Sequence, residues 1–167
     1  RDLPAPFCLE ERYARLRLLT RHRFHLVHAL VRAKSQALDL IYLKASEYTR
    51  VRPFADPFGT ASRAVLREFA SLEELAALPL AQLAEFIDVH GRRHFADPAQ
   101  TARQVQQVAR DSFRLPQALQ APVNLLLDLN FQQLTSLEGQ LKRLDQAIAE
   151  ALQPIPHTLQ TIPGVGP

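Results

Sequence analysis

The chain has 167 residues, which is enough for one domain with a hydrophobic core and short for two. With 47% hydrophobic and 22% charged residues, its composition is globular and excludes wholesale disorder. No run approaches the roughly 18 apolar residues that cross a bilayer, and the first residues lack the apolar segment of a signal peptide, so we expect a soluble intracellular protein without a membrane partner.

Apolar residues recur every three or four positions along the chain and seldom alternate as strands do, so we expect an all-α fold. Residues 1–9 are expected to form an extended, proline-rich tail. They include the single cysteine, Cys8, which excludes an intramolecular disulfide and fits a reducing compartment. In the segment 10–50, one long helix is predicted from about residue 10 to about residue 48. It contains neither glycine nor proline, and its first glutamates suit the positive end of the helix dipole.

Basic residues crowd this first helix, although the whole chain carries a formal charge of only +3. They are Arg12, Arg15, Arg17, Arg21, Arg23, Arg32 and Lys34. Such a local electropositive stripe can attract nucleic-acid phosphates, and a solvated helix face is the alternative interpretation. The candidate nucleic-acid-binding residues here are Arg15, Arg17, Arg21, Arg23 and Lys34.

The segment 51–115 is predicted to be an insert of short helices separated by proline and glycine. They are expected over residues 60–69, over a piece that follows Ser71 and ends before Pro79, over residues 80–89, and over residues 98–113. Helices of this length are too short to stand alone in water, so they must pack on each other or on the long helices.

Several residues indicate where the short helices begin and end. Ser71 and Glu74 have the spacing of a capping box, and Asp97 followed by Pro98 is a typical helix start. Gly91 is predicted to close the third short helix in a left-handed conformation.

The segment 116–153 is predicted to be a second long helix, entered at Pro116 and Pro122, with a heptad pattern of apolar residues. One heptad position holds Leu127, Leu134, Leu141 and Ile148, and the other holds Val123, Asn130, Leu137, Leu144 and Ala151. This seam is typical of a coiled coil, with Asn130 as a residue that could fix register, although an ordinary core helix of a bundle shows the same pattern. The two long helices would form a coiled-coil-like antiparallel pair, or the seam would pair between chains. The candidate oligomerisation residues are Leu127, Leu134, Leu137, Leu141, Leu144 and Ile148.

No catalytic or metal site is identifiable from residue spacing. His22, His25 and His28 are three residues apart, so they drift around the helix, unlike the pair four residues apart that clamps a zinc ion. The serines lie in helical or capping contexts, and the aspartates are scattered singly. We therefore predict neither catalytic residues nor metal ligands in this chain.

The last residues, Thr161 to Pro167, have the composition of a turn that leads into another helix. In a helix–hairpin–helix element, a turn such as Gly164-Val165-Gly166 directs backbone N–H groups at a phosphate. These three residues are therefore further nucleic-acid-binding candidates.

Several stretches of this sequence resemble the one-ten family of bacterial insertion-sequence transposases, which includes the one-sixteen and nine-oh-two elements and Piv-type DNA invertases. The sharpest is the terminal stretch 159–167 after a leucine-rich helix. The others, in the family's order, are Leu16 to Arg23 with Leu26, Val27 and Lys34, then Phe58-Gly59, Leu66, Ser71 to Glu74, and Arg110 to Ser112.

The resemblance implies a function for a larger parent protein, a DNA transposase or site-specific recombinase that mediates insertion-sequence transposition. Such proteins begin with a RuvC-like domain whose four acidic residues bind magnesium, continue through a coiled coil, and finish in a domain with a nucleophilic serine. An element-encoded guide RNA directs them, and they assemble as dimers and tetramers.

By the same resemblance, this chain is expected to lie between the catalytic segments, with residues 154–167 at the start of the C-terminal domain. No catalytic residue is carried over, and magnesium is expected for the parent alone. The expected partners are DNA, the guide RNA and further copies of the chain, in the bacterial cytoplasm. The alternative is a free-standing helical coiled-coil module that binds a partner protein and has no nucleic-acid role.

Overall fold

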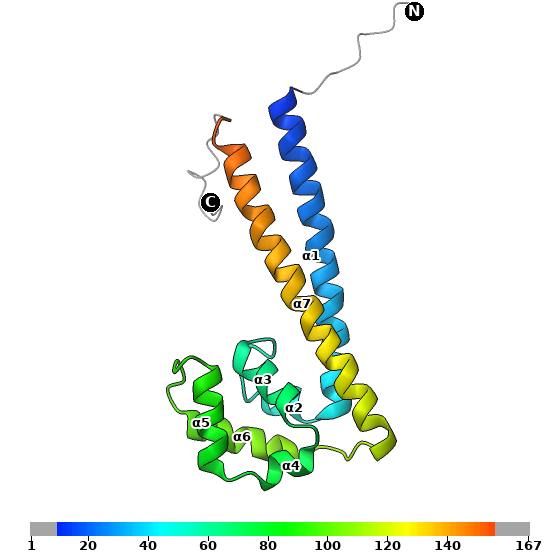
Figure 1. The fold of residues 1–167 in the computed structure, drawn as a ribbon, viewed down its shortest axis with the longest axis vertical. Helices are drawn as coiled ribbons and strands as arrows, with labels where there is room; N and C mark the ends of the chain where they lie inside the picture. Colours follow the sequence, from blue (N-terminus) through cyan, green and yellow to red (C-terminus); the bar gives the residue numbers. More distant parts are fainter. Residues whose placement is uncertain (1–9, 156–167) are drawn as a thin grey trace, which may run out of the picture. The chain divides into compact units, whose positions relative to one another are not determined.

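A computed structural model describes residues 10–155 and confirms the all-α prediction, with two long helices and short helices between them (Figure 1). Within the described residues there is no strand. The elements are α1 (Glu11–Lys44), α2 (Tyr48–Val51), α3 (Thr60–Glu68), α4 (Leu72–Ala77), α5 (Leu80–His90), α6 (Pro98–Asp111) and α7 (Gln117–Leu152). None of the described helices has a stretch apolar and long enough to cross a membrane.

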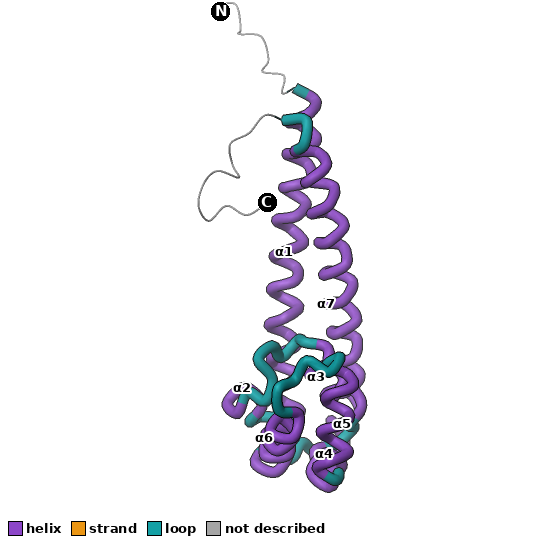
Figure 2. Tube along the Cα trace, turned by 90° about the vertical axis from the view of Figure 1, so that its left-hand side faces the viewer, coloured by secondary structure: helices purple, strands orange, loops and turns teal. Residues whose placement is uncertain are grey.

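The chain divides into two compact units. The described part of unit 1 consists of residues 10–31 and 135–155, and unit 2 consists of residues 32–134. In unit 1 the first part of α1 and the last part of α7 run side by side in opposite directions, as both Figure 1 and Figure 2 show. An ion pair joins them, in which Arg23 Nε lies 2.6 Å from Asp145 Oδ1.

Unit 2 contains the short helices, where α6 packs on α2, α4 and α5, and α5 also packs on α3. Their buried faces supply a core of aliphatic side chains: Val65, Leu83, Ile87, Ala102, Val105 and Val108. Since none of these helices exceeds 14 residues, their stability depends on this shared burial rather than on helix propensity.

The two predicted helix starts in the insert are confirmed. Ser71 Oγ accepts a hydrogen bond from the Glu74 backbone N–H at 3.1 Å, and Asp97 Oδ1 accepts one from the Gln100 N–H at 2.8 Å. The reciprocal bond of the capping box goes to a neighbouring residue, because Glu74 Oε2 accepts from the Ala70 N–H at 3.1 Å. Each cap pairs an N–H group that has no partner inside its helix.

The end of α5 corrects one expectation. Gly91 has a φ of −83°, so it is not left-handed, and the left-handed residues are Arg92 and Arg93 with φ of 54° and 57°. Glycine is needed at position 91 for another reason, since a Cβ there would lie 2.2 Å from Cε2 of Phe95. The close approach of that ring, and not the backbone conformation, accounts for the glycine.

The first long helix is also shorter than expected. α1 ends at Lys44, and the single-turn helix α2 follows after residues 45–47. At this break two serine side chains accept hydrogen bonds from backbone N–H groups. Ser46 Oγ accepts from the Phe113 N–H at 3.2 Å, and Ser112 Oγ accepts from the Glu47 N–H at 3.1 Å. Side-chain oxygens thus replace helical bonds at this position.

The predicted seam of α7 is buried by the chain itself along part of its length. In unit 2, Leu127 and Leu134 are fully buried, and in unit 1 Leu137 is buried as well. Leu141, Leu144 and Ile148, all in unit 1, are half-buried. Unit 1 contains only two helices in its described part, and two helices leave the edges of their shared seam open to solvent.

Candidate nucleic-acid interface

The arginines of α1 in unit 1 do not form one stripe, because a period of 3.6 residues distributes them over two faces. Arg12, Arg15 and Arg23 share one face, and there Arg12 pairs with Glu10 at 2.7 Å while Arg23 pairs with Asp145. Arg17 and Arg21, four residues apart, lie on the opposite face. The sequence interpretation of a single stripe is therefore corrected to two sets, one of which is largely engaged in ion pairs.

The second set continues into aromatic residues. Tyr13, Arg17, Arg21, Phe24 and His28 follow one another at spacings of four, four, three and four, which places them along one face of α1. All five are exposed, and we call this set the basic–aromatic face. Among the described residues, neither Arg17 nor Arg21 forms an ion pair or a side-chain hydrogen bond.

Unpaired arginines four residues apart repel each other, which costs the helix a few tenths of a kcal/mol. An anion bound along the face would remove this repulsion. The arrangement therefore has the electrostatics of a phosphate-binding surface, with two cations that are not engaged elsewhere in the described structure.

The side chain of Phe24 is 60% exposed in the middle of this face. The His28 ring lies edge-on to it, with the centroids 4.2 Å apart and the planes at 62°, and the His25 ring lies 5.9 Å away at 75°. The sequence interpretation missed Phe24, although its spacing from Arg21 and His28 was a visible signal.

The remaining predicted nucleic-acid residues are placed differently. Lys34 belongs to unit 2, where it is half-buried and its Nζ lies 5.3 Å from the centroid of the Phe58 ring. This cation–π contact uses part of its charge within the protein. Gly164, Val165 and Gly166 lie outside the described residues.

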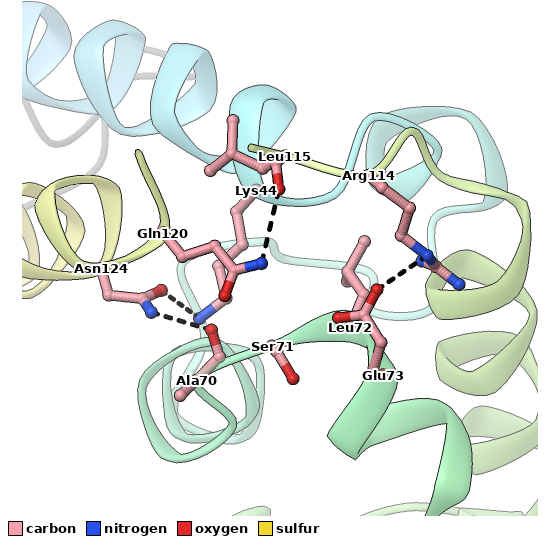
Figure 3. A pocket seen from close by; sticks show the side chains of 9 residues that line it. All are labelled: Lys44, Ala70, Ser71, Leu72, Glu73, Arg114, Leu115, Gln120 and Asn124. Carbon is pink, nitrogen blue, oxygen red and sulfur yellow. Dashed lines mark hydrogen bonds and ion pairs between the residues drawn. The ribbon is translucent and has the colours of Figure 1, made fainter. Parts of the chain in front are cut away.

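Unit 2 contains another lysine, Lys44, which is buried beside a small pocket (Figure 3). Its Nζ donates to the carbonyl oxygens of Leu66 and Phe69 at 2.8 and 2.7 Å and to Asn124 Oδ1 at 2.6 Å. An ammonium has three N–H donors, and all three are used. Asn124 Nδ2 in turn donates to the Ala70 carbonyl at 2.8 Å, as Figure 3 shows.

These contacts make Lys44 a connection between α1, the C-terminal end of α3 and α7. Carbonyl groups at a helix C-terminus lack intrahelical partners and carry partial negative charge. The Lys44 ammonium donates hydrogen bonds to these carbonyl groups, and its positive charge offsets their partial charge. Burial lowers the pKa of Lys44 from 10.5 to about 8, and Glu74 opposes that shift. Nothing in the sequence distinguishes this lysine from a surface residue of an amphipathic helix.

Unit 2 also has an exposed apolar groove between α1 and α7, which we call the outer leucine groove. It is lined by Gln36, Asp39, Leu40, Leu126, Leu129, Asn130 and Gln133. Leu126 and Leu129 are each 51% exposed, whereas the heptad leucines Leu127 and Leu134 point inward and are buried. Asn130, 9% exposed, has a buried Oδ1 that finds no hydrogen-bond partner within residues 10–155.

In the part of the chain that the structure describes, no group of three or more His, Cys, Asp or Glu residues is placed so that it could hold a metal ion. The three histidines of α1 are exposed, and two of them contact Phe24. Comparison with protein-family models, with curated proteins and with solved structures finds no match to this chain.

Proposed function

We propose that this chain is the helical middle segment of a bacterial insertion-sequence transposase of the one-ten family, and that it contacts nucleic acid and holds protomers together. The family assignment rests on the sequence resemblance. The observation that supports nucleic-acid contact is the basic–aromatic face of α1, where Arg17 and Arg21 are exposed and form no ion pair with any residue that the structure describes. Catalysis is assigned to other segments of the parent protein.

The test is a salt titration of nucleic-acid binding. Wild-type chain is mixed with a labelled 20-base-pair DNA duplex and with a single strand of equal length, and Kd is measured by fluorescence anisotropy between 50 and 200 mM salt. We expect Arg17→Gln with Arg21→Gln to weaken binding to all sequences alike and to flatten the slope of log K against log salt by about 0.9 for each lost duplex contact.

A matched control removes the same charge elsewhere. Arg50→Gln with Arg103→Gln changes two exposed arginines of unit 2 and lowers the net charge by the same amount. If the two double variants lose affinity equally, the effect is one of net charge, and the proposed interface is wrong. If the wild-type chain binds neither probe, the nucleic-acid role as a whole is wrong.

Self-association is the other half of the proposal. Because Leu127 and Leu134 are buried within the chain, a second copy would contact the outer leucine groove through Leu126 and Leu129 instead. We expect Leu126→Glu with Leu129→Glu to yield monomers in sedimentation velocity at concentrations where the wild type forms dimers, with unchanged helicity.

The outer leucine groove also favours a second candidate function, a helical module that binds a partner protein and has no nucleic-acid role. Its apolar side chains would accept an amphipathic helix of the partner. This candidate predicts no salt-dependent binding to either nucleic-acid probe. The salt titration therefore separates the two functions.

A further inference from the structure

Phe24 is placed where a base, and not only a phosphate, could be bound. An isolated exposed apolar side chain needs no explanation, but Phe24 lies one turn after Arg21 on the basic–aromatic face, beside two cations. A phenylalanine ring has no group that contacts a phosphate. Its role on a phosphate-binding face would be to offer its π-surface to a nucleobase.

The neighbouring rings hold Phe24 in a suitable orientation. His28 contacts it edge-on, with planes at 62°, and His25 does so at 75° on the same helix. Both contacts are T-shaped and restrict the orientation of the Phe24 ring, and with 60% exposure most of its surface remains open to a ligand. A ring held in this way loses little conformational freedom when a base stacks on it.

Duplex and single-stranded nucleic acids differ in whether the faces of their bases are accessible, and this difference favours one of them as the ligand. In a duplex the bases are stacked on one another, and their faces are out of reach of a side chain on a helix surface. An unpaired strand offers base faces and phosphates together, which matches an aromatic ring preceded by two arginines.

We infer that Phe24, oriented by His28, is a stacking surface for an unpaired base of a single-stranded nucleic acid whose phosphates are bound by Arg17 and Arg21. The inference rests on the proposed nucleic-acid role and specifies its ligand. Base stacking on an aromatic side chain contributes affinity for any base, so the surface selects for single-stranded character and not for sequence.

The test compares Phe24→Ala with Leu18→Ala, which truncates another exposed apolar side chain of α1. Both are titrated by anisotropy against a 15-nucleotide oligo(dT) and a 15-base-pair duplex. Phe24→Ala is expected to bind the single strand about 5- to 100-fold more weakly than the wild type and the duplex equally well. Leu18→Ala is expected to change neither affinity.

A second variant supplies a direct signal. The chain contains no tryptophan, so Phe24→Trp introduces a single indole whose emission is observed alone on excitation at its red edge. We expect oligo(dT) to quench this emission and the duplex to leave it unchanged. Circular dichroism on each variant verifies that α1 remains helical.

The outcomes separate the inference from the proposal on which it rests. If binding depends on Arg17 and Arg21 but Phe24→Ala binds the single strand as tightly as the wild type, the inference is wrong and the proposed function stands. If the indole emission of Phe24→Trp is unquenched in a bound complex, the inference is likewise wrong and the proposed function stands. If the wild-type chain binds no nucleic acid, both fail.

Discussion

The Lys44 ammonium lies 2.6 Å from Asn124 Oδ1, a contact that spans 80 residues of sequence. The same nitrogen donates to the Leu66 and Phe69 carbonyls, so one buried side chain of α1 binds both α3 and α7. Since only 8% of Lys44 is exposed, these bonds are largely shielded from bulk water.

We therefore expect Lys44→Met to destabilise the chain by about 1–3 kcal/mol, because it leaves buried carbonyl oxygens without a donor while keeping a side chain of similar length. Urea unfolding followed by circular dichroism measures the change. Lys142→Met, which alters an exposed lysine of α7, is the control and should lie within about 0.5 kcal/mol of the wild type. A neutral or stabilising Lys44→Met would show that the connection contributes nothing net.

The pH dependence of stability should also reveal Lys44. Its pKa is about 8 in the folded chain and 10.5 in the unfolded one, so between these values the unfolded chain binds more protons. Stability contributed through Lys44 then rises with pH, by about 2 kcal/mol from pH 8 to pH 10. The difference in unfolding free energy between wild type and Lys44→Met should widen across this interval.

Tyr48 limits the pH range over which the stability of the wild type can be attributed to Lys44. Burial raises the pKa of Tyr48, and its hydroxyl hydrogen-bonds with Ser62, so above about pH 10 the unfolded chain alone releases the phenolic proton. That reaction lowers stability and opposes the effect of Lys44. Because both chains share Tyr48, their difference isolates Lys44. A difference that stays constant from pH 8 to pH 10 would contradict the assigned pKa.

Replacing glycine by alanine at positions 91 and 139 should change the stability of the chain in opposite directions. Gly91→Ala places a Cβ 2.2 Å from Phe95 Cε2, and the resulting overpacking should cost about 1–3 kcal/mol. Gly139→Ala, inside α7, meets nothing within 4 Å and should gain about 0.5–1 kcal/mol from the better helix propensity of alanine. Thermal unfolding of both variants is the measurement, and equal shifts in Tm would refute the packing explanation for Gly91.

Asn130 is expected to be a source of instability in the isolated chain. Its Oδ1 is buried without a partner among the described residues, so Asn130→Leu, which keeps the branched shape and the number of side-chain heavy atoms, should raise the unfolding free energy by about 1–2 kcal/mol. Gln133→Leu, on the exposed rim of the same groove, is the control and should change little. Unfolding at two concentrations tenfold apart separates this effect from self-association, and a destabilised Asn130→Leu would mean that the amide has a partner in solution.

The sequence predicted what depends on local interactions. The all-α class, the extent of α7 and the caps at Ser71 and Asp97 each follow from spacing or from a side chain that bonds its own helix end. These features need no knowledge of the rest of the fold.

The failures depend on contacts between segments that are distant in sequence or on geometry around a helix. Lys44 is indistinguishable from a surface lysine until α3 and α7 pack against it. The ring of Phe95, and not the backbone, explains Gly91. At the candidate site, the number of arginines along the chain does not reveal their angular positions, which distribute them over two faces of α1 and place Phe24 beside Arg21.

The capping of α3 by Lys44 has a consequence for the order of folding. The donor for the last carbonyls of α3 comes from residue 44, and that donor is itself held by residue 124, so this end of α3 is complete only after distant parts of the chain have met. The loops between these segments must therefore close before the end of this helix is stabilised. Contacts between residues distant in sequence form slowly, so we expect this step to be slow. In native-state hydrogen exchange, the amides of α3 should open together with the α1 and α7 segments of unit 2 as one cooperative unit, instead of fraying independently as a nine-residue helix otherwise would.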